Sequence, residues 1–573
     1  MKLRFLYIAL FISAFTFAQK KAKDTLKTKV INVVKPFDPS VSDAFKIQKN
    51  PSLETSQAVK HPNFNYKIFS VPVASTFISK RGTFVGLKHP KLQQIYNNFI
   101  SVGYGNDNTP LLEAFIHNNP TKTSDIGAFI NMKSSDANIK SSLLDASYSD
   151  VKIDAFYKQS NNNYDWQLNS GLRLQKSNWY GLGGPLSIAS SYANSINPKQ
   201  DYTNFYAGGS MSYFNSYFEG GTFEFSFFSD DYKTTENYFY AAPQFAFPLS
   251  SEYLTTTFSV GYLDGKFNTG YIIPNPISYS FFNIGVAPNL EVTRKDFIFN
   301  LGVKVYYSSP TAFEQESKFL AYPNITATYK KGMVTFSGGV MGDLHQNSYK
   351  EFANDNPFVS PTLNIKRTDE QYKAFVGLKG VVQNLSYELQ VSYKSEKDKP
   401  LFILNPVKEL SALNRAYSYG NSFNVLYDDV KTFSFTANAE VAYDKNLTLG
   451  GRLNINSYTL TNTSEAWNLP TLKAEIYGKY VYKNWFANTH IYIVGERKDL
   501  PSNLFPTLVP ATFLPVTNDA YVDVNIRGGY HFSDRLSAFA KFNNILGNDY
   551  QEFTNFNVQG FQALAGITYK FGL

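Results

Sequence analysis

The C-terminal residues of the chain alternate between apolar and polar side chains. One face is apolar or aromatic at every position, and its members are Phe561, Ala563, Ala565, Ile567, Tyr569 and Phe571. The other face carries Gln562, Thr568 and Lys570. A period of two predicts a β-strand, and a strand of about ten residues crosses a hydrocarbon layer when it tilts by about 45°. We therefore expect this strand to close a membrane barrel, and its aromatic residues to be recognised by the outer-membrane assembly machinery.

The same alternation recurs along the chain in pairs of strands that are joined by short polar turns. These turns are Gln383-Asn384, Lys445-Asn446, Lys483-Asn484 and Ser533-Asp534. The connections on the other side are longer, and they include Thr461 to Asn468, Asp499 to Pro515 and Gly547 to Gln559. Short turns at one end and long loops at the other are typical of outer-membrane barrels, whose short turns are periplasmic.

From residue 99 to residue 573 this pattern predicts an all-β fold, a large closed antiparallel transmembrane β-barrel of about 22 strands, within about 20 to 24. Aromatic residues gather near the predicted strand ends, where rings anchor a barrel at the lipid headgroups. We expect this interfacial girdle to contain Trp179, Tyr482, Trp485, Tyr530 and Phe532. For the loop residues Trp179 and Trp467, an alternative is stacking against carbohydrate.

The N-terminus has the pattern of an export signal. Lys2 and Arg4 precede an apolar run, and Thr16-Phe17-Ala18 offers the small residues that signal peptidase reads. We predict a signal peptide over residues 1–18, a mature N-terminus at Gln19 and a location in the cell outer membrane. No later stretch approaches 18 consecutive apolar residues, so we expect no membrane-spanning helix.

Composition agrees with a barrel and disfavours other classes. Aromatic residues make up 17% of the chain, and charged residues 17%, below the roughly 25% that is usual in soluble domains. The chain has no cysteine and a formal net charge of +8 without a clustered basic motif, so we expect no disulfide framework and no nucleic-acid partner. The six histidines are scattered, and neither a nucleophile elbow nor a phosphate loop occurs. We predict no enzyme activity, no catalytic residue, no metal site and no cofactor.

Two parts of the chain carry a family resemblance. Lys541–Gly547 with Asp549-Tyr550, followed by Gly566–Phe571, resembles the closing hairpin of TonB-dependent receptors. Phe99–Asn106 and Pro110–Phe115 look like the first barrel strands of such proteins from Bacteroidetes-type bacteria. The resemblance implies a barrel of 22 strands, a size whose lumen is plugged in outer-membrane transporters.

The segment before the barrel departs from that family. Residues 19–98 are too few and too rich in proline for the globular plug of a TonB-dependent receptor, because each proline interrupts a ladder or a helix. Residues 28–34 resemble a TonB box, the short strand that pairs with an energising periplasmic partner, and the alternative is a simple β-tail. We expect this region to occlude the lumen or to dock on a partner through Val30, Val33, Val34, Pro36, Phe37 and Pro39.

Two functions remain open at this point. The first is a channel or uptake component of the TonB-dependent receptor-like class, for a solute that the sequence does not identify. The alternative is a structural or accessory barrel in a multi-protein outer-membrane complex without transport activity. The expected partners are outer-membrane lipid, the assembly machinery, and either other outer-membrane proteins or the energising periplasmic partner.

Overall fold

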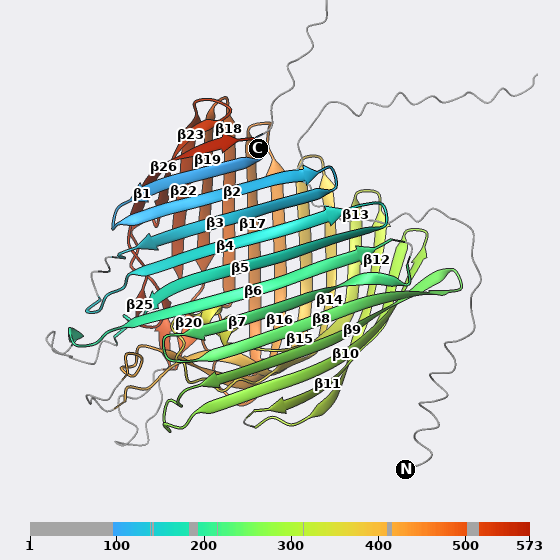
Figure 1. Cartoon of the computed structure of the whole chain (residues 1–573), viewed down its shortest axis with the longest axis horizontal. Helices are drawn as coiled ribbons and strands as arrows, with labels where there is room; N and C mark the ends of the chain where they lie inside the picture. Colours follow the sequence, from blue (N-terminus) through green and yellow to red (C-terminus); the bar gives the residue numbers. More distant parts are fainter. Residues whose placement is uncertain are drawn as a thin grey trace, which may run out of the picture. The chain divides into compact units, whose positions relative to one another are not determined.

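The computed structural model describes residues 96–137, 139, 142–182, 193–214, 216–312, 314–408, 415–500 and 515–572. Most of them lie in long strands, shown in Figure 1. The barrel strands are β1 Asn98–Gly105, β2 Thr109–Thr121, β3 Ser124–Ser135, β4 Tyr148–Ser160, β5 Tyr164–Asn178, β6 Lys199–Tyr213, β7 Phe218–Asp230, β8 Thr235–Leu249, β9 Glu252–Phe267, β10 Ile277–Arg294, β11 Phe297–Thr311, β12 Lys318–Lys331, β13 Val334–His345, β14 Thr368–Val382, β15 Leu385–Leu404, β16 Phe423–Ala442, β17 Leu447–Leu460, β18 Leu472–Tyr482, β19 Trp485–Val494, β22 Tyr521–His531, β23 Leu536–Asn543 and β26 Gln562–Phe571.

These strands form one 22-stranded sheet in which each strand pairs with its neighbours in the chain. All pairings are antiparallel, and β26 returns to pair with β1, from Asn98↔Phe571 to Gly105↔Leu564. The sheet is therefore a closed up-and-down barrel, and the predicted fold class and strand number are confirmed. Such closure leaves no unpaired sheet edge, which a bilayer would not tolerate.

The alternation of side chains separates an outer face from a lumen. On β17 and β18, the aliphatic residues Leu449 and Ile476 are 43% and 51% exposed on the outer face. The intervening residues face inward, where Arg452 forms an ion pair of 3.1 Å with Glu475. An apolar exterior around a polar interior is the arrangement of a transmembrane barrel. The chain is thus an integral protein of the cell outer membrane.

Inward-facing tyrosines lie over glycines of the neighbouring strand. A Cβ added to Gly171 would be 2.3 Å from the ring of Tyr206, and one added to Gly450 would be 2.1 Å from the ring of Tyr477. Only glycine leaves room for these rings, and the ring in turn covers backbone that has no side chain. The hydroxyl groups then reach carboxylates on the wall, Asp154 for Tyr206 and Glu440 for Tyr477.

The two ends of the barrel differ. One end, called the turn end here, carries the hairpin turns predicted from Gln383-Asn384, Lys445-Asn446, Lys483-Asn484 and Ser533-Asp534, and the pairings around them confirm these turns. The other end, called the loop end, holds the long connections. Their small elements are α3 Tyr349–Asp355, β20 Arg497–Asp499, β21 Val516–Asn518, β24 Gln551–Phe553 and β25 Phe556–Asn557.

Helices contribute little to the described part of the chain. None of them is both long and apolar enough to cross a membrane.

Candidate functional site

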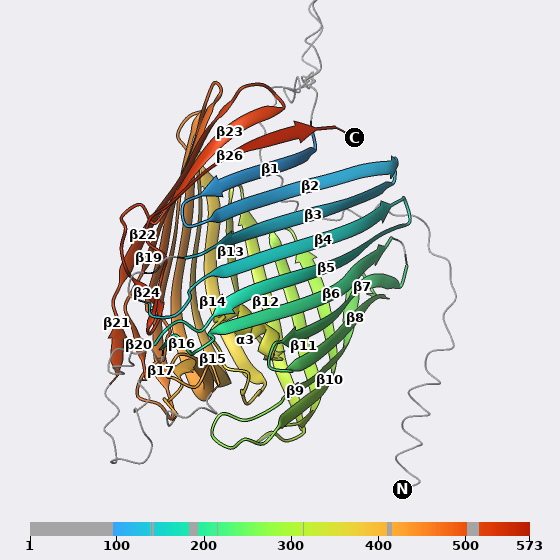
Figure 2. The ribbon, with the colours of Figure 1, turned by 60° about the vertical axis from the view of Figure 1, so that its left-hand side comes forward.

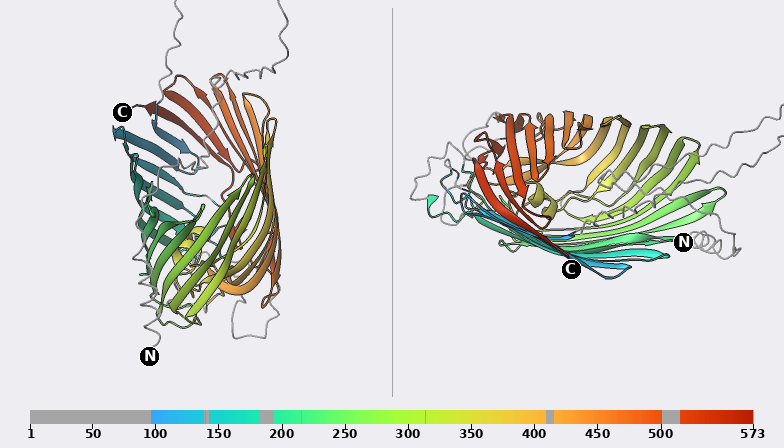
Figure 3. Two further views of the ribbon diagram at one scale, coloured as in Figure 1. Left: turned by 90° about the vertical axis from the view of Figure 1, so that its right-hand side faces the viewer. Right: turned by 90° about the horizontal axis from the view of Figure 1, so that it is seen from above.

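The connection between β13 and β14 folds back into the barrel and forms the centre of a lid. Figure 2 shows α3 inside the ring of strands, and the view from above in Figure 3 agrees. Ser348 caps the start of the helix, and its side chain accepts a hydrogen bond from the backbone N–H of Glu351. Asn356 caps the end, and its N–H donates to the carbonyl of Phe352. Ser348 and Glu351 have the spacing of a capping box, which is the signal in the sequence that could have revealed this helix.

The lid packs into an aromatic core that it shares with the barrel strands. Tyr349 is fully buried and meets the ring of Phe267 on β9 edge-on, with centroids 5.0 Å apart. Phe352 packs against Phe402 on β15, so the helix touches strands on two sides of the lumen. The buried core consists of Tyr202, Phe228, Leu263, Phe267, Tyr279, Phe281, Tyr349, Phe352, Ala353, Val359, Leu363, Ile365, Leu404, Phe423, Val425 and Phe556. Burying each large side chain contributes about 1.5–3 kcal/mol, so this core holds the lid firmly in the lumen.

Two carboxylates of the barrel wall accept hydrogen bonds from residues at the start of the helix. Glu236 on β8 is 2% exposed and accepts hydrogen bonds from the backbone N–H groups of Tyr349 and Lys350, at 2.7 and 3.0 Å. Its third donor is the hydroxyl of Tyr279, at 2.6 Å. Asp230 on β7 accepts from the hydroxyl of Tyr349 at 2.9 Å. A carboxylate at the N-terminus of a helix also interacts favourably with the helix dipole.

Trp179 belongs to this lid and not to the interfacial girdle, so its predicted position is wrong. Its side chain is 0% exposed and packs edge-on against Tyr232 and Tyr417. The indole N–H donates to the carbonyl of Phe358 at 3.1 Å. The prediction failed because proximity to a strand end in the sequence does not reveal that the following loop turns inward and covers the ring.

A buried carboxylate joins two of the loops and the end of β15. Asp499 in β20 is 0% exposed and accepts from the hydroxyl of Thr554 at 2.6 Å and from the backbone N–H of Leu404 at 3.3 Å. Burial raises the pKa of Asp499 to about 6, because the charged form is poorly solvated there. Nearby, Arg497 donates to the backbone carbonyls of Glu552 and Gln551. The loop end is therefore a packed unit and not a set of separate loops.

Below the lid, two separate parts of the lumen wall carry charged side chains. Glu475 is shared by Arg452 and His490, with the His490 ring nitrogen 2.9 Å away. On another part of the wall, Lys304 and Tyr306 both reach Asp343, at 2.6 and 2.9 Å. The described residues contain no cluster of three or more metal-ligating acids or histidines. The inner wall is therefore polar and carries charges of both signs.

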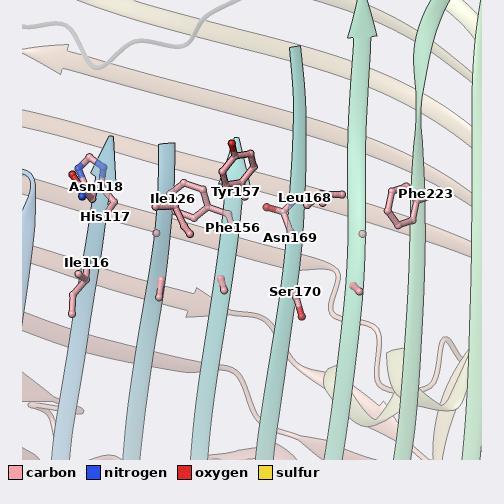
Figure 4. A pocket seen from close by; sticks show the side chains of 15 residues that line it. Ile116, His117, Asn118, Ile126, Phe156, Tyr157, Leu168, Asn169, Ser170 and Phe223 are labelled. Atoms are coloured by element: carbon pink, nitrogen blue, oxygen red, sulfur yellow. The ribbon is translucent and has the colours of Figure 1, made fainter. Parts of the chain in front are cut away.

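A hollow of about 800 Å³ lies on the barrel wall across β2 to β7 (Figure 4). Its bulky lining residues Ile116, Ile126, Leu168 and Phe223 are each among the exposed apolar side chains of the outer face. Small residues such as Ala155 and Ala207 form its floor. It is a depression in the lipid-facing surface, and a polar solute would have to leave water to reach it.

The other predicted residues are distributed as follows. In β26, Ala565, Ile567 and Tyr569 lie exposed on the outer face, and Ala563 and Phe571 are partly exposed in the same strand. Phe561 precedes the strand and is 47% exposed. Tyr482, Trp485 and Phe532 are exposed beside the turns at the turn end, where the rings of Trp485 and Tyr530 are 4.9 Å apart. Their roles in insertion and anchoring remain predictions. Val30, Val33, Val34, Pro36, Phe37 and Pro39 lie outside the described residues.

Comparison with solved structures identifies similar folds. The iron transporter FrpB from Neisseria meningitidis (F3-3 variant) matches with a TM-score of 0.61 and 10% identity, over 84% of this chain and 82% of that one. The siderophore receptor PirA from Acinetobacter baumannii matches with a TM-score of 0.59 and 11% identity, over 83% and 80%. The ferric-catecholate import receptor Fiu from E. coli K12 matches with a TM-score of 0.59 and 9% identity, over 83% and 81%. At these identities, the likeness establishes the fold.

Comparisons of sequence give no further relative. No protein-family model matches the chain, and no curated protein matches it.

Proposed function

We propose that this chain is an uptake barrel of the TonB-dependent receptor-like class, which admits a solute from the outside through its lumen. The observation that carries the proposal is the lid, which is packed into the loop end of a barrel whose inner wall is polar. A barrel of 22 strands left open would breach the permeability barrier, so a closable mouth is what an uptake protein needs at rest. The transport and receptor roles of the similar structures support the same class.

Opening requires α3 to leave the lumen while the strands stay paired. The helix belongs to a single connection, from His345 to Thr368, and so it can move without breaking a strand pairing of the barrel. Its aromatic contacts and the hydrogen bonds to Glu236 would be lost in that movement. Solute binding or a partner at the loop end would have to supply this free energy.

A second barrier is part of the proposal. Residues 19–98, with the segment from Val30 to Pro39, are proposed to block the lumen from the periplasmic side. Residues 28–34 would be the point at which an energising partner acts, by adding a strand. Residues 19–95 lie outside the described part of the chain, and their proline-rich sequence supports this part of the proposal.

Conductance in planar lipid bilayers tests the proposal. Replacing residues 348–366 with a short Gly-Ser linker removes α3, and deleting residues 20–90 removes the N-terminal segment. We expect a large conductance at least in the protein that carries both changes, and sensitivity of cells to bulky antibiotics. A matched linker replacement of residues 501–514, in another loop, should leave the barrel closed. If the doubly altered barrel inserts but does not conduct, the uptake proposal fails.

The accessory-barrel alternative predicts a different result. Gentle detergent extraction of the full chain would then recover a stoichiometric protein partner, and the lid replacement would weaken that association without opening a conducting path.

A further inference from the structure

Two cations face each other on the lumen wall. Arg527 on β22 and Lys541 on β23 are direct partners in the antiparallel register. Both lie on the inward face, since Phe542 next to Lys541, and Val522 at an alternate position five residues before Arg527, are exposed on the outer face. Like charges directly opposite each other on one face of a sheet are destabilising. Such a pair therefore needs a reason to be present.

The described residues do not neutralise this pair. Neither side chain forms a hydrogen bond or an ion pair within 4.0 Å in the described ranges. The Arg527 guanidinium lies 4.6 Å from the centroid of the Phe539 ring, which holds its plane in place, and its Nε is buried without a partner. A third cation, Lys133, lines a hollow together with Lys541. The local excess of charge is positive.

The pair opens onto two adjoining hollows of the lumen. The larger, of about 440 Å³, is lined by Arg527 and Lys541 together with Asn488, His490, Tyr492 and Asn525. The smaller, of about 170 Å³, contains Lys133 and shares Lys541 and Asn543 with the first. His490 is already held by Glu475, Asn525 donates to Asp523, and Asn543 donates to Gln562. The nitrogen donors that remain among the described residues lining the larger hollow are Arg527, Lys541 and the Asn488 amide.

From this geometry we propose that the wall of β19, β22 and β23 holds a binding site for an anionic solute, with a carboxylate or phosphate group between Arg527 and Lys541. The guanidinium offers two parallel N–H groups to two oxygens of such a group, and the ammonium adds a third donor. The rest of the solute lies in the hollow beside Asn488 and Tyr492. An anionic group bound between Arg527 and Lys541 offsets the repulsion between the two cations, which accounts for their position opposite each other.

This inference deepens the proposed function by naming the chemical class of the solute, but its test does not depend on transport. Isothermal titration calorimetry is carried out on the purified full chain in detergent micelles at fixed ionic strength. The probes are citrate and inorganic phosphate. We expect saturable binding of at least one probe, and their relative affinities report whether the site prefers carboxylate or phosphate.

Three variants locate the site. Arg527→Gln combined with Lys541→Gln should weaken binding by about tenfold or more, because two charge-assisted contacts are lost. Arg527→Lys keeps the charge but loses the planar fork, and we expect a smaller loss. Lys479→Gln, which removes an inward-facing lysine outside both hollows, should change the affinity less than twofold. Heat-modifiable mobility on gels confirms that each variant is folded.

Two results would overturn the proposal. One is the absence of saturable binding of either probe to the folded wild-type chain. The other is an equal loss of affinity in Lys479→Gln, which would show attraction to the overall charge and not to a site. A barrel that binds the probe with this residue dependence but never conducts would retain the site and refute the uptake function.

Discussion

Two tryptophans that the sequence places in the same girdle show how differently the ends of this barrel are built. Trp485, at the turn end, is 59% exposed on the outer face, whereas Trp179, at the loop end, is 0% exposed beneath other loops. At the turn end each ring meets lipid and water, as its place in a strand pattern implies. At the loop end the rings meet one another. The strands enclose the lumen, and at the loop end their inward-facing side chains pack with loop residues in the largest buried apolar cluster among the described residues.

The difference suggests that the strands and turns determine assembly of the barrel, whereas the loop end determines closure of the lumen. Deleting Tyr569–Leu573 is expected to have the largest effect. It removes the end of the strand that closes the barrel against β1, so the chain should be exported and then degraded without assembling. Phe571→Ala should act in the same direction. Heat-modifiable mobility measures assembly, and normal mobility of the truncated chain would contradict the claim that the last strand is needed for assembly. The Gly-Ser replacement of residues 348–366 should assemble normally.

A charge on the outer face should have the next largest effect. Ile476 is 51% exposed near the middle of β18, and Ile476→Arg should cost about 2–4 kcal/mol of barrel stability, because the cation faces hydrocarbon. Lys473→Ala and Lys479→Ala, on the inward face of the same strand, should be tolerated. Folding yield into lipid vesicles against urea checks this prediction. Equal yields for all three variants would mean that the two faces are assigned incorrectly.

Removing the carboxylate that fastens the lid should affect the loop end alone. Glu236→Ala leaves the N–H groups of Tyr349 and Lys350 and the Tyr279 hydroxyl without their acceptor, at a cost of about 1–3 kcal/mol. Faster hydrogen exchange over residues 349–356, with unchanged assembly, is the expected result. Glu224→Ala is the matched control, because Glu224 is an exposed partner of Lys350 and such pairs contribute little. Loss of assembly in Glu236→Ala would show that assembly of the strands depends on packing of the loop end.

The smallest expected effect is a dependence of lid closure on pH. Desolvation in the lumen raises the pKa of Glu351 to about 7, and the negative charge of Glu236 adds to this shift. Because the pKa is raised in the docked state, protonation favours docking, and this stabilisation is present below about pH 4.5 and is lost as the pH rises through about 7. Exchange over residues 349–356 should be slower at pH 5 than at pH 8 after correction for the intrinsic rate. In Glu351→Gln this difference should shrink, and an unchanged difference would exclude Glu351 as its source.

The sequence predicts the barrel well, because each strand and turn is specified by residues that are close together in the chain. Alternation in segments such as Leu472–Tyr482 specifies both the strand and the face on which each side chain lies. Turns such as Lys483-Asn484 then fix the register by their length. The closed barrel and its 22 strands follow from repeating this rule along the chain.

The lid is hard to predict for the opposite reason. Glu236 and Tyr349 are 113 residues apart, and neither position is part of a periodic pattern that marks it as buried in the lumen. Trp179 is misplaced because its partners, Tyr232, Phe358 and Tyr417, come from three other connections. The capping box at Ser348 indicates a helix, but it does not say where that helix packs.

The seam between β1 and β26 has a consequence for the kinetics of folding. Ser101 and Thr568 form a hydrogen bond of 2.9 Å across it, although 467 residues separate them in the chain. The entropy of closing a ring grows only slowly with its length, by about 0.6 kcal/mol per doubling, so the long separation costs little at equilibrium. Contacts of such high contact order form slowly, however, and until they form β1 and β26 each present an unpaired edge. Formation of the seam is thus the last step of folding, and it covers the strand edges from which aggregation starts. A chaperone that shields β1 would act mainly before the seam forms.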